Sequence, residues 1–305
     1  MRPSDYSFFR YLEAKKSVDD KALNAGVMKR LGQEVAAWGE KQIEVLEVGA
    51  GIGTMAQRLI ETGMLKRARY RLTDLETENL ERAREYLMKW VAENRLTVLE
   101  GSGNQLHFAR SEMDVRVEFQ VDDATADAGN GGELADVLVA NAVLDLLDLQ
   151  PALAKLMRRV RPGGLCYFTI NYDGMTIFEP EIDERLDAEI RRLYDVTMDE
   201  RVTDGKPSGD SWTGRHLFGA LEQTGATVLA TGSSDWMVYA TDGRYPNDEA
   251  YFLHFIIHTV YEALRDRPEL NIAAFAEWTE ERHAQIERGE LVYIAHQLDY
   301  LARKR

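Results

Sequence analysis

Short apolar segments alternate with amphipathic segments through the first half of the chain. Consecutive apolar, β-branched residues predict strands, and apolar residues spaced three or four positions apart predict helices. The pattern places strands at 43–48, 68–75, 115–123, 135–143 and 165–172, with helices after the first, second and fourth of them. Because strands that alternate with helices are typical of parallel sheets covered on both faces, we expect an α/β fold.

The second half of the chain predicts the end of the sheet and several additional helices. A helix is expected at 214–225, a strand region at 226–240, two helices at 247–266 and 270–288, and a closing strand at 290–304. An extra piece between 94 and 115, with Gly-Ser-Gly at its centre, suggests a small hairpin or loop. We interpret 1–305 as a single domain, with its core at about 40–172, 213–242 and 290–305 and cap segments at 1–38, 173–212 and 243–289.

The composition restricts the partners of this 305-residue chain, which has a formal net charge of −15 and one cysteine, Cys166. An acidic chain repels nucleic acid unless a local basic patch overrides the average, and the basic runs here are short. A single cysteine excludes an internal disulfide and a cysteine-rich metal site. No apolar run reaches the roughly 18 residues of a membrane span, and the N-terminus lacks the apolar centre of a signal peptide. We therefore expect a cytoplasmic protein with no nucleic-acid or membrane partner.

Three alternate glycines follow the first predicted strand in the segment VLEVGAGIGTMAQRLIETG, residues 45–63. Gly49, Gly51 and Gly53 allow a tight turn and a close approach of the backbone to a ligand, and the following helix offers free N–H groups. Nicotinamide dehydrogenases use a similar loop, but their G-x-G-x-x-G pattern requires glycine where this chain has Thr54. The loop alone therefore indicates a ligand site without identifying the ligand.

Carboxylates end the strands beside this loop. Glu47 lies near the end of the first strand, Asp74 ends the second, and Asp122 and Asp123 end the third. The carboxyl ends of parallel strands form the edge at which doubly wound folds bind ligands. Asp74 can accept both hydroxyls of a ribose, although it is also a typical cap for the helix after it, and Asp122 or Asp123 can accept from an adenine amino group. So many carboxylates favour a cationic ligand over a pyrophosphate.

Five segments in this order resemble the successive motifs of class I S-adenosylmethionine-dependent methyltransferases: VLEVGAGIGTMAQRL, LTDLETENLERAREYL, VEFQVDDATA, ADVLVANAVLDLL and LMRRVRPGGLCYFT. The match covers about residues 43–170, and the RPGG turn before the fifth strand is a habit of this family. The resemblance implies a Rossmann-like, mostly parallel sheet of seven strands, the last of them antiparallel, with helices on both faces and helical cap insertions. It also implies S-adenosyl-L-methionine as the cofactor and methyl transfer as the reaction.

The resemblance assigns roles to particular residues. Glu47 would face the methionine amino group, the three glycines would line the methionine, and Asp74 would hold the ribose. Asp123 with Ala124 would hold the adenine, and Asn141 would lie near the methyl group and the acceptor. The full set expected at the cofactor is Glu47, Gly49, Ala50, Gly51, Gly53, Asp74, Leu75, Asp122, Asp123, Ala124 and Asn141.

No residue is identified as the catalyst, because methyl transfer from a sulfonium depends largely on aligning the acceptor in a dry pocket. Asp145 and Asp148 follow the fourth strand, where the family often carries a polar group, although both also fit the solvated start of a helix. Tyr172 and Asp173 end the fifth strand, beside the expected acceptor. The candidates for a catalytic role are Asn141, Asp145, Tyr172, His254 and His258.

The segment YFLHFIIHTVY, residues 251–261, places Tyr251, His254, His258 and Tyr261 on one stripe of a predicted helix. The stripe is either a wall of the acceptor site or a set of buried polar side chains in a contact between elements. Two histidines four positions apart suit a metal ion, but no third ligand is evident, so we expect no metal.

The segment DYSFFRYLEAKK, near the N-terminus, clusters aromatic residues and is expected to pack on the core as a helix. In the family that the chain resembles, such a segment often closes over the cofactor, which makes Tyr6, Tyr11 and Lys15 candidates for the pocket. The extensive cap segments favour an enclosed small-molecule acceptor.

Other functions remain open at this stage. The alternatives are a protein or RNA methyltransferase, a non-catalytic protein that binds the cofactor, an enzyme that transfers another group, and a nicotinamide dehydrogenase. The acceptor atom and the oligomeric state are not predicted by the sequence.

Overall fold

The computed structural model describes residues 2–123, 126, 133–203 and 205–305. In this part of the chain, ten strands form one sheet in the order β10-β12-β7-β6-β1-β2-β5-β4-β3, with β11 paired to β12. These strands are β1 Ile43–Val48, β2 Arg67–Asp74, β3 Thr97–Glu100, β4 Gln105–Arg110, β5 Met113–Val121, β6 Ala135–Asn141, β7 Val160–Glu179, β10 Ala226–Ser233, β11 Trp236–Val238 and β12 Val292–Lys304. A separate short pair consists of β8 Val202–Thr203 and β9 Lys206–Pro207.

Seven strands of the large sheet have the arrangement expected from the sequence, which confirms the α/β prediction. β5, β2, β1, β6 and β7 run parallel to one another, and β12 lies antiparallel between β7 and β10. The hairpin of β3 and β4 adds two strands beyond β5, where the extra piece was expected, and β11 adds a third. The hairpin joins the sheet because its pairing with β5 buries Leu106 and Phe108.

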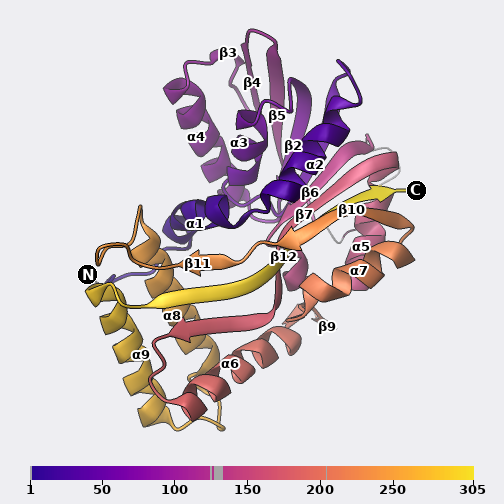
Figure 1. Cartoon of the computed structure of the whole chain (residues 1–305). Helices are drawn as coiled ribbons and strands as arrows, with labels where there is room; N and C mark the ends of the chain where they lie inside the picture. Colours follow the sequence, from indigo (N-terminus) through magenta and orange to yellow (C-terminus); the bar gives the residue numbers. More distant parts are fainter. Residues whose placement is uncertain (1, 124–125, 127–132, 204) are drawn as a thin grey trace.

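Helices cover both faces of the sheet (Figure 1). They are α1 Phe8–Ala22, α2 Ala25–Ala36, α3 Thr54–Glu61, α4 Thr77–Glu93, the 3₁₀ turn η1 Leu144–Leu146, α5 Leu149–Arg158, α6 Glu184–Asp199, α7 Thr213–Gln223, α8 Glu249–Leu264 and α9 Ile272–Arg288. One apolar cluster joins α2, α3 and α4 to the sheet, and another joins α5 and α7 to it. The expected cap segment 1–38 is wrong for α2, because its buried Val27, Leu31 and Val35 belong to the core.

The cap grows from two strands that continue beyond the parallel part of the sheet. Residues 176–179 of β7 pair with the first residues of β12, and α6, α8 and α9 lie beside them (Figure 1). The expected cap segment 173–212 therefore begins too early, because β7 continues to Glu179 and its last residues pair with β12. β7 also starts earlier than expected, at Val160, so the RPGG sequence lies within the strand. We call α1, α6, α8 and α9 the cap helices; side chains from all four share one apolar cluster.

A buried carboxylate marks the place where the pairing of β7 and β12 becomes irregular. Ile170 in β7 has a left-handed φ of 57°, which is unusual for a β-branched residue. Asp299 of β12 accepts hydrogen bonds from the N–H groups of Ile170 and Asn24, both at 2.8 Å. Burial raises the pKa of Asp299 to about 6. This side chain therefore ties the two long strands to the link between α1 and α2.

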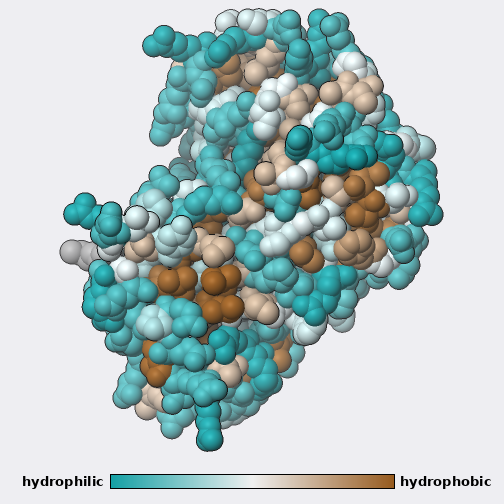
Figure 2. Space-filling view, in the orientation of Figure 1, coloured by the Kyte–Doolittle hydropathy of each residue, from teal (hydrophilic) through white to brown (hydrophobic). Residues whose placement is uncertain are grey.

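Polar and charged residues cover most of the face in Figure 2, and apolar residues gather there in small groups. The outline is notched between the part that holds α3 and α4 and the part that holds the cap helices (Figures 1 and 2). Among the helices of the described ranges, none combines the length and the apolar character that crossing a membrane requires.

Candidate active site

The glycine loop joins β1 to α3 at the carboxyl edge of the parallel strands. Gly49, Gly51 and Gly53 have left-handed φ angles of 60°, 53° and 77°. A Cβ at Gly49 would lie 2.5 Å from Val143, in the turn after β6, so a larger residue does not fit there. A Cβ at Gly51 would have one neighbour within 4 Å among the described residues, Leu12 of α1 at 3.6 Å. The middle of the loop is therefore the part that a ligand can approach.

Asp74, at the end of β2, holds the glycine loop in place. Its Oδ2 accepts a hydrogen bond from the Gly51 N–H at 2.8 Å. Its Oδ1 accepts from the Glu76 N–H at 3.0 Å and from the Asn79 side-chain amide at 2.9 Å, which fixes the start of α4. A carboxylate has about four acceptor positions, so Oδ2 retains one for a ribose hydroxyl. Asp74 thus combines the ligand-binding geometry with the structural role considered as its alternative.

Glu47 lies beneath the loop and is almost completely buried. The Tyr70 hydroxyl, from β2, donates a hydrogen bond to its Oε2 at 2.7 Å. Burial raises the pKa of Glu47 to about 7, against the opposing effects of that hydrogen bond and of Arg58. An ionised carboxylate in such a place is costly unless a cation compensates it. The position therefore suits the amino group of a methionine moiety.

The two acids after β5, Asp122 and Asp123, both contact Arg159. The Asp122 carboxylate forms an ion pair with Arg159, and the Asp122 N–H donates to the Asp74 carbonyl at 3.1 Å. The carbonyl of Asp123 accepts a hydrogen bond from Arg159 at 2.9 Å. Leu75 is 62% exposed, which leaves an apolar side chain available at this edge. Ala124, the remaining residue expected at the adenine, lies outside the described residues.

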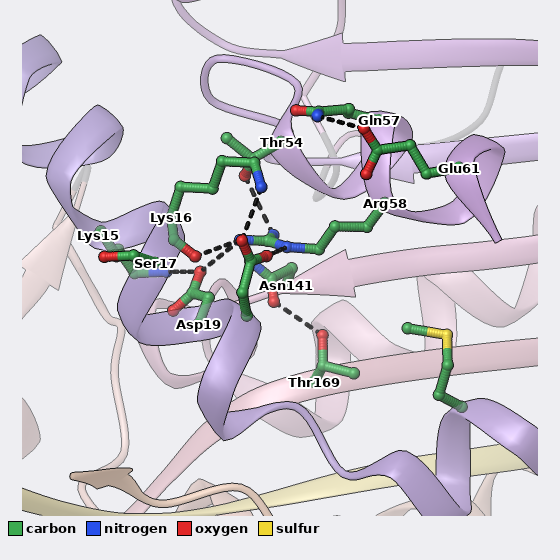
Figure 3. Close-up of polar contacts among 12 residues, drawn as sticks. Lys15, Lys16, Ser17, Asp19, Thr54, Gln57, Arg58, Glu61, Asn141 and Thr169 are labelled. Carbon is green, nitrogen blue, oxygen red and sulfur yellow. Dashed lines mark hydrogen bonds and ion pairs between the residues drawn. The ribbon is translucent and has the colours of Figure 1, made fainter. Parts of the chain in front are cut away.

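The turn after β6 holds Asn141 at the same edge. The Thr169 hydroxyl, from β7, donates to Asn141 Oδ1 at 2.8 Å (Figure 3). Ala142 follows with a left-handed φ of 56°, and its N–H donates to the Thr169 carbonyl at 2.9 Å. Non-glycine residues in this conformation cost free energy and cluster at functional sites.

The N-terminal helix α1 is attached to α3 through Arg58, a contact that the sequence did not predict (Figure 3). The buried Arg58 side chain donates to Asp20 Oδ1 at 2.5 Å, to the Lys16 carbonyl at 3.1 Å and to Thr54 Oγ1 at 3.2 Å. Since α3 begins directly after the glycine loop, these bonds hold α1 beside the loop. A basic residue in a short helix carries no sequence signal for a partner 38 positions away.

Asp19 makes a second attachment of α1, to β11. Its carboxylate accepts from Lys15 at 2.5 Å and from the Trp236 indole N–H at 2.9 Å. Lys15 is buried, so its charge is compensated by Asp19 within the same helix. Tyr11, the other pocket candidate on α1, stacks on Phe255 of α8 with a ring separation of 4.3 Å.

Asp145 and Asp148 lie in different environments although they are three positions apart. Asp145 Oδ1 is buried and has no hydrogen-bond partner among the described residues, and burial raises the pKa of this carboxyl. The Asp145 carbonyl accepts from the Asp210 N–H at 3.3 Å. Asp148 is exposed, makes no capping hydrogen bond for α5, and lines a surface pocket of about 490 Å³.

Tyr172 and Asp173, at the edge of the expected acceptor site, both have partners within the protein. The Tyr172 hydroxyl donates to Asp195 at 2.7 Å, and burial raises its pKa far above the ordinary range. Asp173 is buried and accepts from the Arg215 side chain at 2.8 Å. These hydrogen bonds link β7 to α6 and α7.

The polar stripe of α8 packs against its neighbours: Tyr251 contacts Ser7, His254 contacts His283, His258 stacks on Tyr6, and Tyr261 stacks on Phe275. The Nδ1 atoms of His254 and His283 are 2.8 Å apart, and burial lowers their pKa values to about 4 and about 3. These contacts correspond to the packing alternative, so we place no acceptor contact on this stripe. Within the described ranges, no group of three or more acidic, histidine or cysteine side chains is arranged to hold a metal ion.

The residues at the edge fit the cofactor expected from the sequence. Glu47 offers a buried carboxylate for an ammonium group, Gly51 offers an accessible backbone, and Asp74 offers an acceptor for a ribose hydroxyl. The sequence predicted this group of residues, and the structure brings them together.

Comparisons with known proteins identify the family of the chain. A family model described as a methyltransferase domain matches residues 21–231. A structure from Bacillus halodurans C-125, assigned as a methyltransferase, is 14% identical with a TM-score of 0.50 and covers 90% of this chain and 98% of its own. The fold is also similar to YjhP from E. coli, at 15% identity, TM-score 0.47 and coverage of 97% and 99%. A third neighbour is magnesium protoporphyrin IX methyltransferase from Synechocystis with bound SAH, at 12% identity, TM-score 0.43 and coverage of 80% and 86%. A comparison with curated proteins finds no match.

Proposed function

Because the chain belongs to the class I S-adenosylmethionine-dependent methyltransferases, we propose that its methyl acceptor is a small molecule bound beneath the cap helices. One observation carries this proposal. Ala142 after β6, Tyr11 of α1 and Tyr194 of α6 all pack on the same apolar cluster. The edge beside Asn141 is therefore covered by folded helices, which suits an enclosed acceptor better than a protein surface or an RNA strand.

Each residue in the cofactor half of the site has its own role in this proposal. Glu47 binds the amino group of the methionine moiety, Gly51 lines it with backbone, and Asp74 accepts from the ribose. Asp123 and the exposed Leu75 lie toward the adenine. This placement rests on the left-handed glycine loop and on the hydrogen bond from Gly51 to Asp74.

The acceptor half supplies alignment and exclusion of water. When bound, the cofactor supplies a methyl group on a sulfonium sulfur: the carbon–sulfur bond breaks, its electron pair stays on sulfur, and the acceptor's lone pair forms the new bond to carbon. Asn141, fixed by Thr169, lies where the two halves meet. Holding the acceptor in line in a dry site can supply much of the rate enhancement.

The test uses methyl-labelled S-adenosylmethionine and a cell extract divided by ultrafiltration into small-molecule and macromolecule fractions. We expect label to enter the small-molecule fraction with the wild-type protein and to fall strongly with Asp74→Ala. Label confined to proteins or RNA would overturn the proposal in favour of a macromolecular acceptor. No label in either fraction, from a protein that binds adenosylhomocysteine, would indicate a non-catalytic binding protein.

A further inference from the structure

The turn after β6 carries a carboxylate with one buried oxygen that lacks a partner among the described residues. Asp145 Oδ1 is buried without a hydrogen-bond partner among the described residues. The side chain belongs to η1, three residues after the strained Ala142 and four after Asn141. It therefore lies at the carboxyl edge of the sheet, close to the place where the acceptor is proposed to bind.

Two aromatic side chains of the cap share an apolar cluster with the turn that carries Asp145. Tyr11 of α1, Tyr194 of α6 and Ala142 all pack on this cluster, and both tyrosines are partly buried. Asp145 also interacts electrostatically with the two tyrosines.

The charged groups around Asp145 do not pair with it. Lys15 attracts it at a distance, but the ammonium group of Lys15 is 2.5 Å from Asp19. Arg201 also attracts it but forms no hydrogen bond or ion pair with it in the described part of the chain, and Asp210 repels it. Burial has the largest effect on the pKa of this carboxyl. It raises the pKa and therefore disfavours the ionised form. An unpaired buried carboxylate destabilises the folded protein unless a ligand compensates it.

We propose that Asp145 binds a basic nitrogen of the acceptor, so that the substrates of this enzyme are small amines. A carboxylate attracts an ammonium group by charge, and aromatic rings on the same side of the site can add attraction through their faces. The proposal rests on the proposed function, since it identifies the class of the acceptor in the same site. Asp145 acts here as a specificity-determining residue that orients the acceptor.

The first test separates acceptors by charge and uses the unaltered protein. The small-molecule extract is passed over a strong cation exchanger at acidic pH, which retains compounds with a basic nitrogen and lets neutral alcohols, phenols and carboxylic acids pass. Both fractions are then neutralised and incubated with methyl-labelled S-adenosylmethionine and the enzyme. We expect label in the retained fraction. Label only in the unretained fraction would overturn the amine assignment and leave the proposed function intact.

The second test compares Asp145→Asn with Asp148→Asn, a matched change in the same turn. With the retained fraction at limiting concentration, we expect Asp145→Asn to lower labelling at least tenfold, while Asp148→Asn stays within twofold of wild type. Both variants should bind adenosylhomocysteine within twofold of wild type. Asp145→Asn should also raise the midpoint of thermal unfolding, because it removes an unpaired buried charge. Wild-type labelling by Asp145→Asn, or parallel losses of cofactor affinity and stability, would contradict a role in acceptor recognition.

These tests give a different result if the proposed function itself is wrong. If neither fraction is labelled by a wild-type protein that binds adenosylhomocysteine, methyl transfer to a small molecule is wrong, and the amine assignment falls with it.

Discussion

The polar contacts at the glycine-loop edge join residues close in the sequence, whereas those in the cap join residues far apart in the sequence. At the edge, Asp74 bonds to residues 2, 5 and 23 positions away. In the cap, Asp187 pairs with Arg282 across 95 positions, and Lys21 pairs with Glu249 across 228. Local contacts can be recognised in a sequence, whereas pairs between distant elements exist only in the fold. The two regions are also expected to serve two ligands, the cofactor and the acceptor, and can therefore be perturbed separately.

The largest effect should come from the ion pair inside the cap. Asp187 and Arg282 are buried together, and the Trp278 indole N–H also donates to Asp187 at 2.8 Å. Asp187→Ala leaves Arg282 uncompensated, so we expect the free energy of unfolding to fall by about 3–5 kcal/mol in a urea titration. Glu189→Ala, which removes a surface carboxylate paired with Arg192 in the same helix, should lower the free energy of unfolding far less.

The same variant tests whether the two regions are independent. Adenosylhomocysteine affinity of folded Asp187→Ala, measured by calorimetry at low temperature, should stay within about twofold of wild type. A parallel loss of cofactor affinity would show that the cap and the glycine-loop edge act as one unit.

At the glycine-loop edge, Asp74→Ala should lower cofactor affinity by about 2–3 kcal/mol, because it removes the ribose acceptor and the bond to Gly51. Glu78→Ala, in the exposed first turn of α4, serves as the control and should leave the affinity unchanged. Calorimetric titration with adenosylhomocysteine gives both values. Unchanged affinity in folded Asp74→Ala would mean that this residue only fixes the loop and the start of α4.

Two glycine substitutions separate backbone strain from ligand contact. Gly51 and Gly63 have left-handed φ angles of 53° and 73°, and a Cβ at Gly63 meets nothing within 4 Å among the described residues. Gly51→Ala and Gly63→Ala should each cost about 1–2 kcal/mol of stability. Only Gly51→Ala should also weaken cofactor binding, by roughly tenfold, or about 1.4 kcal/mol, because its Cβ enters the space beside the ligand. Equal affinities for the two variants would place the cofactor away from the loop.

The smallest expected effect is a pH dependence from Glu47. Its pKa is raised to about 7, so the carboxyl is mostly protonated at pH 6 and mostly ionised at pH 7.5. An ammonium ligand requires the ionised form, so cofactor affinity should rise about eightfold over this interval. Glu47→Gln should flatten the profile. For the free protein the sign is opposite: a raised carboxyl pKa contributes stability at low pH, which is lost as pH rises from about 4.5 through 7.

The range of the contacts explains which features the sequence predicted. The strand 43–48 was predicted with the bounds of β1, and the three glycines were expected to form a turn, because these features depend on neighbouring residues. The sequence did not predict Arg58, because its partners lie in another helix. It also ended β7 too early, because the pairing of 176–179 depends on β12, more than a hundred positions later.

The sequence predicted the role of Asp145, after β6, only in part. The position of Asp145 next to a strand end made it a candidate, but nothing local distinguished it from Asp148. The structure separates them, because only Asp145 has a buried carboxylate oxygen without a partner among the described residues. Asp145 also interacts electrostatically with Tyr11 of α1 and Tyr194 of α6, which come from distant parts of the chain.

Calorimetric titration of the wild-type protein tests most directly whether the glycine-loop edge binds S-adenosylmethionine. We expect adenosylhomocysteine to bind at a single site with micromolar affinity, about −8 kcal/mol, and to weaken at least tenfold in Gly51→Ala. Binding of NAD in place of adenosylhomocysteine, or no binding of either by the folded protein, would contradict the account.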